Sequence, residues 1–186
     1  MGIFDKLFGK KERKVSEKSA GGQLSKGRSL KHYADGETGF SFNYSDLVGW
    51  TIQKPPQVKA PARLTFVNYQ LKANLVFGFI QLPNVIPDLS GSGILDAAVA
   101  NIFDSYQRSH PGACLLSSRL VTNPNNSVKG VEVVYTDQVQ GDLWKGKLIA
   151  FFKGSKRYDV TAFALQENFD RADREFFALV LKSFNF

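Results

Sequence analysis

Cysteine and histidine are scarce in this chain of 186 residues, which holds one Cys and two His. Since a disulfide needs two thiols, Cys114 by itself excludes one within the chain. His32 and His110 lie far apart, and the chain has no Cys-x-x-Cys or His-x-x-x-His spacing of the kind that zinc sites use. We therefore expect no disulfide, no metal and no cofactor.

Long apolar runs and nucleotide-binding motifs are also missing. No apolar stretch approaches the ~18–20 residues that cross a bilayer, and charges interrupt residues 1–9, so no secretory h-region is present. Gly91-Ser92-Gly93 precedes an apolar periodic segment, but the Lys of a P-loop does not follow it. We expect it to be a loop and helix cap. These absences favour a cytoplasmic protein, with peripheral attachment to the inner face of the membrane as the alternative.

The candidate catalytic side chains each have a simpler structural explanation. Cys114 lies in the apolar run Ala113–Leu116 and is expected to be a small buried residue rather than a nucleophile. His32 is expected to be solvated, and His110, which precedes Pro111, is expected to end a helix.

Three carboxylates are candidates for acid–base chemistry. Asp96 and Asp104 lie off the apolar face of their helix, and Asp88 lies in a connection. Solvated surface is the interpretation that the pattern favours, so the sequence predicts no catalytic site. An enzyme with an unrecognised site remains the least favoured alternative.

The charge of +7 is concentrated at the N-terminus. Residues 1–32 hold nine Lys/Arg and three Asp/Glu, whereas the rest of the chain holds fifteen and fourteen. A nearly neutral remainder argues against a basic nucleic-acid-binding face on it. The whole chain has 43% hydrophobic residues, including sixteen Phe, so the chain has enough apolar residues to bury a core without disulfides or metals.

The N-terminal region is predicted to be a flexible basic arm of two parts. Residues 1–11 form a short amphipathic segment whose apolar residues follow helical spacing, with lysines elsewhere on the wheel. The residues of interest there are Ile3, Phe4, Lys6, Leu7, Phe8, Lys10 and Lys11. Residues 12–32 are rich in Ser, Gly and Lys and predict a disordered linker. The arm is a plain tail, a weak contact for anionic membrane surfaces, or a docking peptide for protein or nucleic acid.

Residues 33–186 are predicted to form one domain. Alternating or apolar runs bounded by turn residues predict strands. These strands cover Gly39–Tyr44, Trp50–Gln53, Leu64–Gln70, Leu75–Leu82, Cys114–Thr122, Val128–Val139, Leu143–Lys153 and Arg157–Leu165. The last four are joined by hairpin-sized connections, which indicates an antiparallel meander.

Two helices complete the predicted domain. Ile94–Ser109 has one apolar face, made by Leu95, Val99, Ile102, Phe103 and Tyr106. Asp170–Ser183 has another, made by Ala172, Phe176, Leu179, Val180 and Phe184. The strands after residue 142 are apolar on both faces, so either helices cover both faces or one face presents a hydrophobic surface.

The order of elements and two aromatic motifs resemble the PsbP/DcrB superfamily over about residues 33–186. The motifs are Gly39–Tyr44 (GFSFNY) followed by Trp50, and Leu181–Phe186 (LKSFNF) after Phe176. The superfamily includes PsbP subunits of photosystem II, bacterial DcrB-type proteins, a nuclear Ran-binding release factor and the Eag chaperones of type VI secretion. The resemblance implies an α+β fold, an antiparallel sheet with helices on both faces, and partner binding without catalysis.

The chain departs from that superfamily at its N-terminus. It lacks a transit or secretory signal and a lipobox cysteine, and the basic arm is not part of the shared pattern. No binding residue is therefore carried over. The resulting hypothesis is a chaperone-like binding module for a protein or peptide, with a peripheral membrane adaptor that uses the arm as the alternative.

Overall fold

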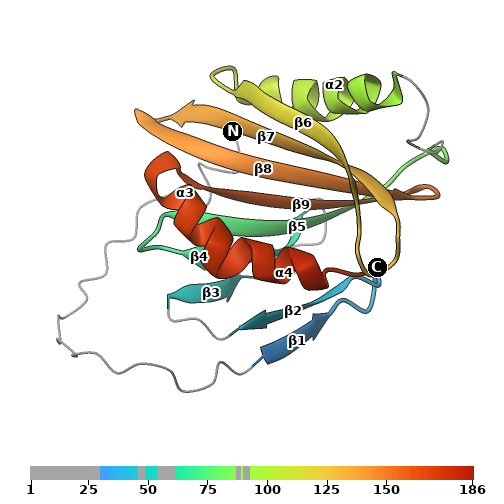
Figure 1. Cartoon of the computed structure of the whole chain (residues 1–186), viewed down its shortest axis with the longest axis horizontal. Helices are drawn as coiled ribbons and strands as arrows, with labels where there is room; N and C mark the ends of the chain where they lie inside the picture. Colours follow the sequence, from blue (N-terminus) through green and yellow to red (C-terminus); the bar gives the residue numbers. More distant parts are fainter. Residues whose placement is uncertain (1–29, 46–48, 54–61, 87–88, 90–92) are drawn as a thin grey trace.

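The computed structural model describes residues 30–45, 49–53, 62–86, 89 and 93–186 (Figure 1). In these residues, seven strands form one antiparallel sheet in the order β3-β4-β5-β9-β8-β7-β6, and β1 and β2 form a separate hairpin. The strands are β1 (Leu30–Ala34), β2 (Ser41–Ser45), β3 (Trp50–Gln53), β4 (Ala62–Asn68), β5 (Ala73–Gln81), β6 (Cys114–Thr122), β7 (Lys129–Val139), β8 (Asp142–Lys153) and β9 (Lys156–Leu165). The predicted meander of the last four strands is confirmed.

Helices lie on both faces of the sheet, as the resemblance implied. Helix α2 (Ile94–Gln107) packs on one face, and α3 (Gln166–Ala172), a π-helical turn (Asp173–Phe177) and α4 (Ala178–Ser183) run across the other (Figure 1). In β8, Ile149 and Phe151 face the C-terminal helices, whereas Leu148 and Ala150 face α2. The prediction that both faces of this strand are apolar is confirmed. None of the described helices is long and apolar enough to cross a membrane.

The larger core lies between the sheet, the C-terminal helices and the β1–β2 hairpin. It is built largely from phenylalanine, and the Phe42 ring of β2 stacks on Phe77 of β5 with centroids 4.3 Å apart. Phe184 packs on Phe77 and on Phe40, so the two predicted aromatic motifs meet in space. Asn185 also pairs with Ser41 through backbone hydrogen bonds, which tie the end of the chain to the hairpin.

The C-terminal helix differs from its predicted form. It begins at Gln166, directly after β9, rather than at Asp170, because Phe169 is buried in its first turn. The π-helical turn then rotates the chain so that Phe176 and its neighbour Phe177 are both fully buried, while Leu179 is only partly covered. The predicted apolar face therefore lacked one phenylalanine.

The N-terminal boundary of the domain also needs correction. The predicted linker extends to His32, yet Leu30–Ala34 forms β1, which pairs with Ser41–Ser45. Backbone hydrogen bonds to β2 hold β1 in the strand conformation. Its side chains are mostly exposed, so the sequence shows no apolar alternation that would predict a strand. The folded part of the chain thus includes Leu30–Ala34.

A buried amide on β5 provides a stability prediction. Asn74 is fully buried, and neither its Nδ2 nor its Oδ1 has a hydrogen-bond partner within the described part of the chain. We expect Asn74→Leu to raise the free energy of unfolding by about 1–3 kcal/mol, because an unpaired buried polar group is costly. The matched control is Asn68→Leu, which should destabilise, since the Asn68 Oδ1 accepts a hydrogen bond from the Leu71 N–H at 3.0 Å. Urea unfolding followed by circular dichroism measures both, and a less stable N74L variant would contradict the prediction.

Candidate binding groove beside helix α2

The pairing register brings the candidate site together on the face of the sheet that carries α2. Val76, Thr161 and Leu148 lie in one row across β5, β9 and β8. The adjacent rows place Phe163 on one side and Asp159 on the other. Because alternate residues of a strand share a face, these side chains all project toward the same side as α2.

The end of α2 forms the wall of this hollow. It contributes Tyr106, and the residues that follow the helix contribute Ser109 and His110. The enclosed volume is about 200 Å³, and the described residues that line it are Ala62, Val76, Gly78, Tyr106, Ser109, His110, Tyr135, Leu148, Asp159, Thr161 and Phe163. We call this hollow the α2 groove.

Aromatic stacking orders the wall. The His110 ring lies parallel to Tyr106 with centroids 4.1 Å apart, and the His110 Nδ1 lies 3.1 Å from the Tyr106 carbonyl oxygen. Tyr106 in turn contacts Tyr135 of β7 at a centroid distance of 4.6 Å. These rings join the end of the helix to the sheet and so fix the width of the groove.

Gly146 of β8 leaves room for the Tyr135 ring. The two residues are partners across β7 and β8, and a Cβ atom at Gly146 would lie only 2.2 Å from the Tyr135 Cζ. Since real Cβ atoms do not approach so closely, only glycine allows the ring to lie down on the sheet at this point. The position of Tyr135 in the groove therefore depends on the missing side chain of Gly146.

Both tyrosines are neutral hydrogen-bonding groups at neutral pH. Burial raises the pKa of Tyr135. Burial, followed by the neighbouring Tyr135 hydroxyl and the Asp137 carboxylate, raises the pKa of Tyr106. The Tyr106 hydroxyl donates a hydrogen bond to Asp137 Oδ2 at 3.1 Å. The Tyr135 hydroxyl is buried and makes no hydrogen bond of good geometry to a described residue, although it lies close enough to the Tyr106 hydroxyl to help raise the pKa of that group.

An ion pair lies at the other end of the groove. The Arg157 Nε donates to Asp159 Oδ1 at 2.7 Å, and both side chains are only 15% exposed. Burial raises the pKa of Asp159, although the Arg157 guanidinium opposes that rise. The pair places charged groups at one end of a mainly apolar floor made by Val76, Leu148 and Phe163, with Thr161 among them.

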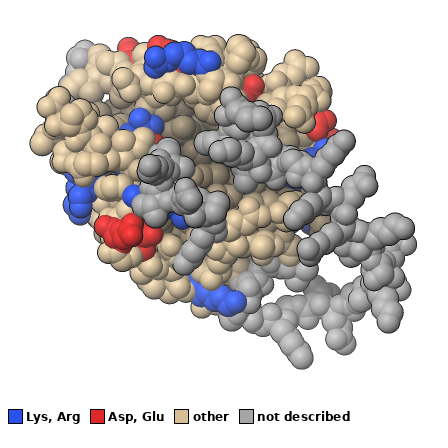
Figure 2. Space-filling view, turned by 180° about the vertical axis from the view of Figure 1, so that it is seen from behind, with Lys and Arg blue, Asp and Glu red and all other residues tan. Residues whose placement is uncertain are grey.

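The side of the molecule that faces away from the viewer in Figure 1 has a mostly uncharged described surface. Seen from behind the view of Figure 1, most of the described surface consists of residues other than Lys, Arg, Asp and Glu (Figure 2). A second hollow, on the opposite face beside α3, is polar and open, and its Lys145 and Asp170 already pair with each other at 2.9 Å. A third, beside β3, is lined by Trp50 and Phe176, whose rings stack at 4.0 Å as part of the core.

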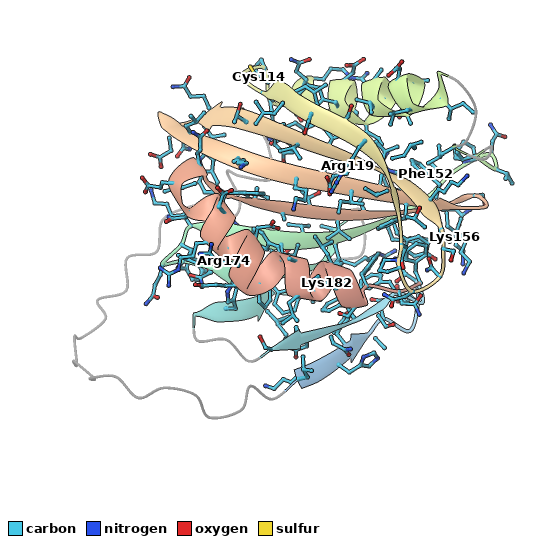
Figure 3. The ribbon with its side chains drawn as sticks, in the orientation of Figure 1. Cys114, Arg119, Phe152, Lys156, Arg174 and Lys182 are labelled. Atoms are coloured by element: carbon cyan, nitrogen blue, oxygen red, sulfur yellow. The ribbon has the colours of Figure 1, made fainter. Side chains whose placement is uncertain are left out.

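Cys114 is not where the sequence placed it. The apolar run predicts burial, but the side chain is exposed at the start of β6, at the outer margin of the sheet (Figure 3). The reason is that β6 is an edge strand, so the neighbouring Leu115 and Leu116 are also 43% and 55% exposed. An apolar run does not tell a central strand from an edge strand.

The remaining predicted residues are placed as follows. His32 is exposed on β1, with its Nδ1 2.9 Å from the Asn43 Oδ1. His110 follows the end of α2 as predicted, and Asp96 and Asp104 are exposed on that helix. Gly93 precedes α2 with a φ of 78°, which suits a glycine cap.

Two other results concern the described residues and the arm. In the described part of the chain, no group of three or more His, Cys, Asp or Glu side chains is arranged to hold a metal ion. Asp88 and the arm residues Ile3, Phe4, Lys6, Leu7, Phe8, Lys10 and Lys11 lie outside the described residues. Membrane contact through the arm remains a prediction.

The architecture, an antiparallel sheet between helices, has structural likenesses among solved proteins. The fold is similar to the solution structure of the cyanobacterial PsbP protein CyanoP from Synechocystis sp. PCC 6803, with a TM-score of 0.65 and 16% identity over 90% of this chain and 97% of that one. Protein PA94 from Pseudomonas aeruginosa matches with a TM-score of 0.44 and 15% identity over 78% of this chain and 89% of that chain. A Bacteroides thetaiotaomicron structure matches with a TM-score of 0.49 and 13% identity over 83% of this chain and 47% of that chain.

These likenesses are structural. No protein-family model and no curated protein sequence matches the chain. At 16% identity, the match to CyanoP confirms the predicted resemblance in fold to the PsbP/DcrB superfamily. The function has to be argued from the groove itself.

The sequence pattern does not reveal the groove residues on the strands. Tyr135 and Asp137 continue, at every second position of β7, the face that carries Val131 and Val133, which looks like ordinary strand patterning. One available signal is Gly146, because a glycine inside a strand often marks the close approach of another group. That Tyr135 is the group close to this glycine follows only from the pairing of β7 with β8.

Proposed function

We propose that this protein is a non-catalytic binding module that holds an apolar segment of a partner protein in the α2 groove. The observation that carries the proposal is an apolar floor beside a buried tyrosine hydroxyl that lacks a described partner of good geometry. Val76, Leu148 and Phe163 supply the floor, and Tyr135 supplies the hydroxyl. A peptide provides both complements, since its side chains are apolar and its backbone offers hydrogen-bonding groups.

The size of the groove supports a side chain as the occupant. Its volume of about 200 Å³ is below the roughly 300–1,000 Å³ of typical small-molecule and cofactor sites. One or two aliphatic or aromatic side chains suit it better. Anchor side chains of this kind, buried in a pocket and surrounded by a polar rim, dominate the energy of many protein interfaces.

The neutral state of the tyrosines supports binding rather than catalysis. A general base works best with a pKa near the working pH, whereas the pKa values of Tyr106 and Tyr135 are raised above that of ordinary tyrosine. Both groups are therefore suited to donate hydrogen bonds and to offer ring surface. The buried Asp137 carboxylate accepts from Tyr106 and holds it in place.

A photo-crosslinking experiment in cells tests the proposal. Ser109 lies exposed at the rim of the groove, so p-benzoylphenylalanine at this position should capture a protein bound there. The matched control carries the same residue in place of Leu116, an exposed position on the opposite face. We expect one protein to be joined through an apolar segment at position 109 and not at position 116. Equal capture at both positions, or none at 109, would exclude the groove as the binding site.

Tyr135→Phe separates binding from folding. Removing a buried hydroxyl that lacks a good hydrogen bond should leave the free energy of unfolding unchanged or raise it by up to about 1–3 kcal/mol. The same change should weaken binding of the captured segment by roughly 2–10-fold, because a typical hydrogen bond contributes about 0.5–1.5 kcal/mol. Fluorescence anisotropy with the segment as a labelled synthetic peptide measures the affinity. Unchanged affinity would show that Tyr135 serves only as ring surface.

A further inference from the structure

The α2 groove and the N-terminal arm have complementary chemistry. The groove has an apolar floor, and the arm presents Ile3, Phe4, Leu7 and Phe8 at helical spacing. A segment of eleven residues is too short to keep a stable helix in water, where isolated helices under ~12–15 residues are marginal. It needs a surface against which its apolar side chains can be buried.

We infer that residues 3–8 of the arm dock into the α2 groove of the same chain and compete there with the partner segment. The inference rests on the proposed function, because it assigns the arm as a regulator of that same groove. The groove volume of about 200 Å³ admits one or two apolar side chains of the segment, which would lie on Val76, Leu148 and Phe163. The occupant is the chain's own arm, not a second copy.

Charge does not distinguish this occupant from others. Helix α2 carries the exposed carboxylates Asp96 and Asp104, but neither lines the groove, and Arg108 directly follows the helix. The carboxylate that does line the groove, Asp159, is paired with Arg157. The attraction for the arm therefore comes from its apolar residues.

The linker is long enough for docking within one chain. Residues 9–29 separate the segment from Leu30, where β1 begins on the other face of the sheet. These residues span up to about 70 Å when extended and have an average end-to-end distance of about 25 Å as a flexible chain. A domain of this size has a radius of gyration of about 15 Å, so the linker reaches around the edge of the sheet.

The tether makes weak docking effective. A short flexible linker gives an effective concentration on the order of 1 mM. If the docked state has a dissociation constant on the order of 0.1 mM, the arm occupies the groove about nine-tenths of the time and lowers the apparent affinity for a partner roughly 10-fold. Removing the apolar residues of the arm should therefore strengthen partner capture by a similar factor.

Photo-crosslinking of the purified full chain tests the docking. With p-benzoylphenylalanine at Ser109, we expect the groove to be joined to the tryptic peptides 1–6 or 7–10, as detected by mass spectrometry. The Leu116 probe on the opposite face should not give these products. Phe4→Asp with Phe8→Asp should reduce them more than 10-fold, whereas Leu24→Asp, which changes an apolar residue of the linker, should not.

Mixing unlabelled and 15N-labelled chains separates docking within a chain from docking between chains. Products that carry one isotope only support the inference, and mixed products at micromolar concentration would overturn it in favour of exchange between copies. Absence of arm products at position 109 would also overturn it.

Three outcomes distinguish docking of the arm from binding of a partner in the groove. If the arm is never joined to position 109 while a partner is captured there in cells, the proposed function stands and the arm is not its regulator. If the arm is joined but no partner is captured even from the F4D/F8D variant, the regulatory role is overturned. If F4D/F8D raises partner capture about 10-fold, both are supported.

Discussion

Phe176→Ala is expected to lower the free energy of unfolding by about 3–5 kcal/mol, the cost of removing a large aromatic side chain from a packed core. Phe176 is fully buried. Its ring stacks on Trp50 with centroids 4.0 Å apart and meets the edge of Phe66 at 5.2 Å. The variant therefore leaves a cavity between the C-terminal helix and the strands β3 and β4.

Urea unfolding monitored by circular dichroism measures this loss. Arg174→Ala is the matched control, because Arg174 is exposed on the same π-helical turn (Figure 3). Its effect should stay within about 0.5 kcal/mol, as is usual for surface positions. A loss below about 1 kcal/mol for F176A, far under the usual cost of such a truncation, would mean that the aromatic stack does not hold the helix on the sheet.

Gly146→Val is expected to disturb both the fold and the groove. The new side chain would occupy the space of the Tyr135 ring, which a Cβ atom alone would approach to 2.2 Å. Overpacking of this kind costs about 1–3 kcal/mol, and sometimes more. The displaced ring would move into the groove, so partner capture at position 109 should fall more than 10-fold.

A double variant identifies the cause. Tyr135→Ala combined with Gly146→Val should recover part of the lost stability, with a coupling of about 0.5–3 kcal/mol between two residues in contact. Gly36→Ala is the control, since Gly36 lies in a turn where an added Cβ atom would have no neighbouring atom within 4 Å. Simple additivity of the two changes at 135 and 146 would show that the two side chains do not compete for one space.

The element pattern is largely predictable because it depends on local chemistry. The strands from Cys114 to Leu165 are separated by turn residues at hairpin spacing, and their predicted bounds agree within two residues with β6 to β9. Helix α2 begins at the predicted Ile94, and its buried residues Val99, Ile102 and Phe103 come from the predicted face. Periodicity carries this information because a helix or strand presents one side to the core.

Other features depend on pairing between distant residues. β1 has an exposed, polar pattern that predicts a linker, since only its partner Ser41–Ser45 makes it a strand. The edge position of β6 explains the exposure of Cys114, for which the sequence predicts burial. The sheet order joins β5 to β9 across a long stretch of sequence, and no local signal encodes that neighbour.

Composition and local patterns correctly predict the α+β class, the two apolar faces of the sheet and the aromatic core motifs. These follow from composition and from periods of two and 3.6 residues, which are local properties. The position of the groove, by contrast, depends on how distant elements pack together. Tyr106, Tyr135 and Phe163 come from three separate elements and meet only through sheet register and helix packing. A binding surface is formed by residues that non-local contacts bring together, whereas secondary structure depends largely on residues that are neighbours in the sequence.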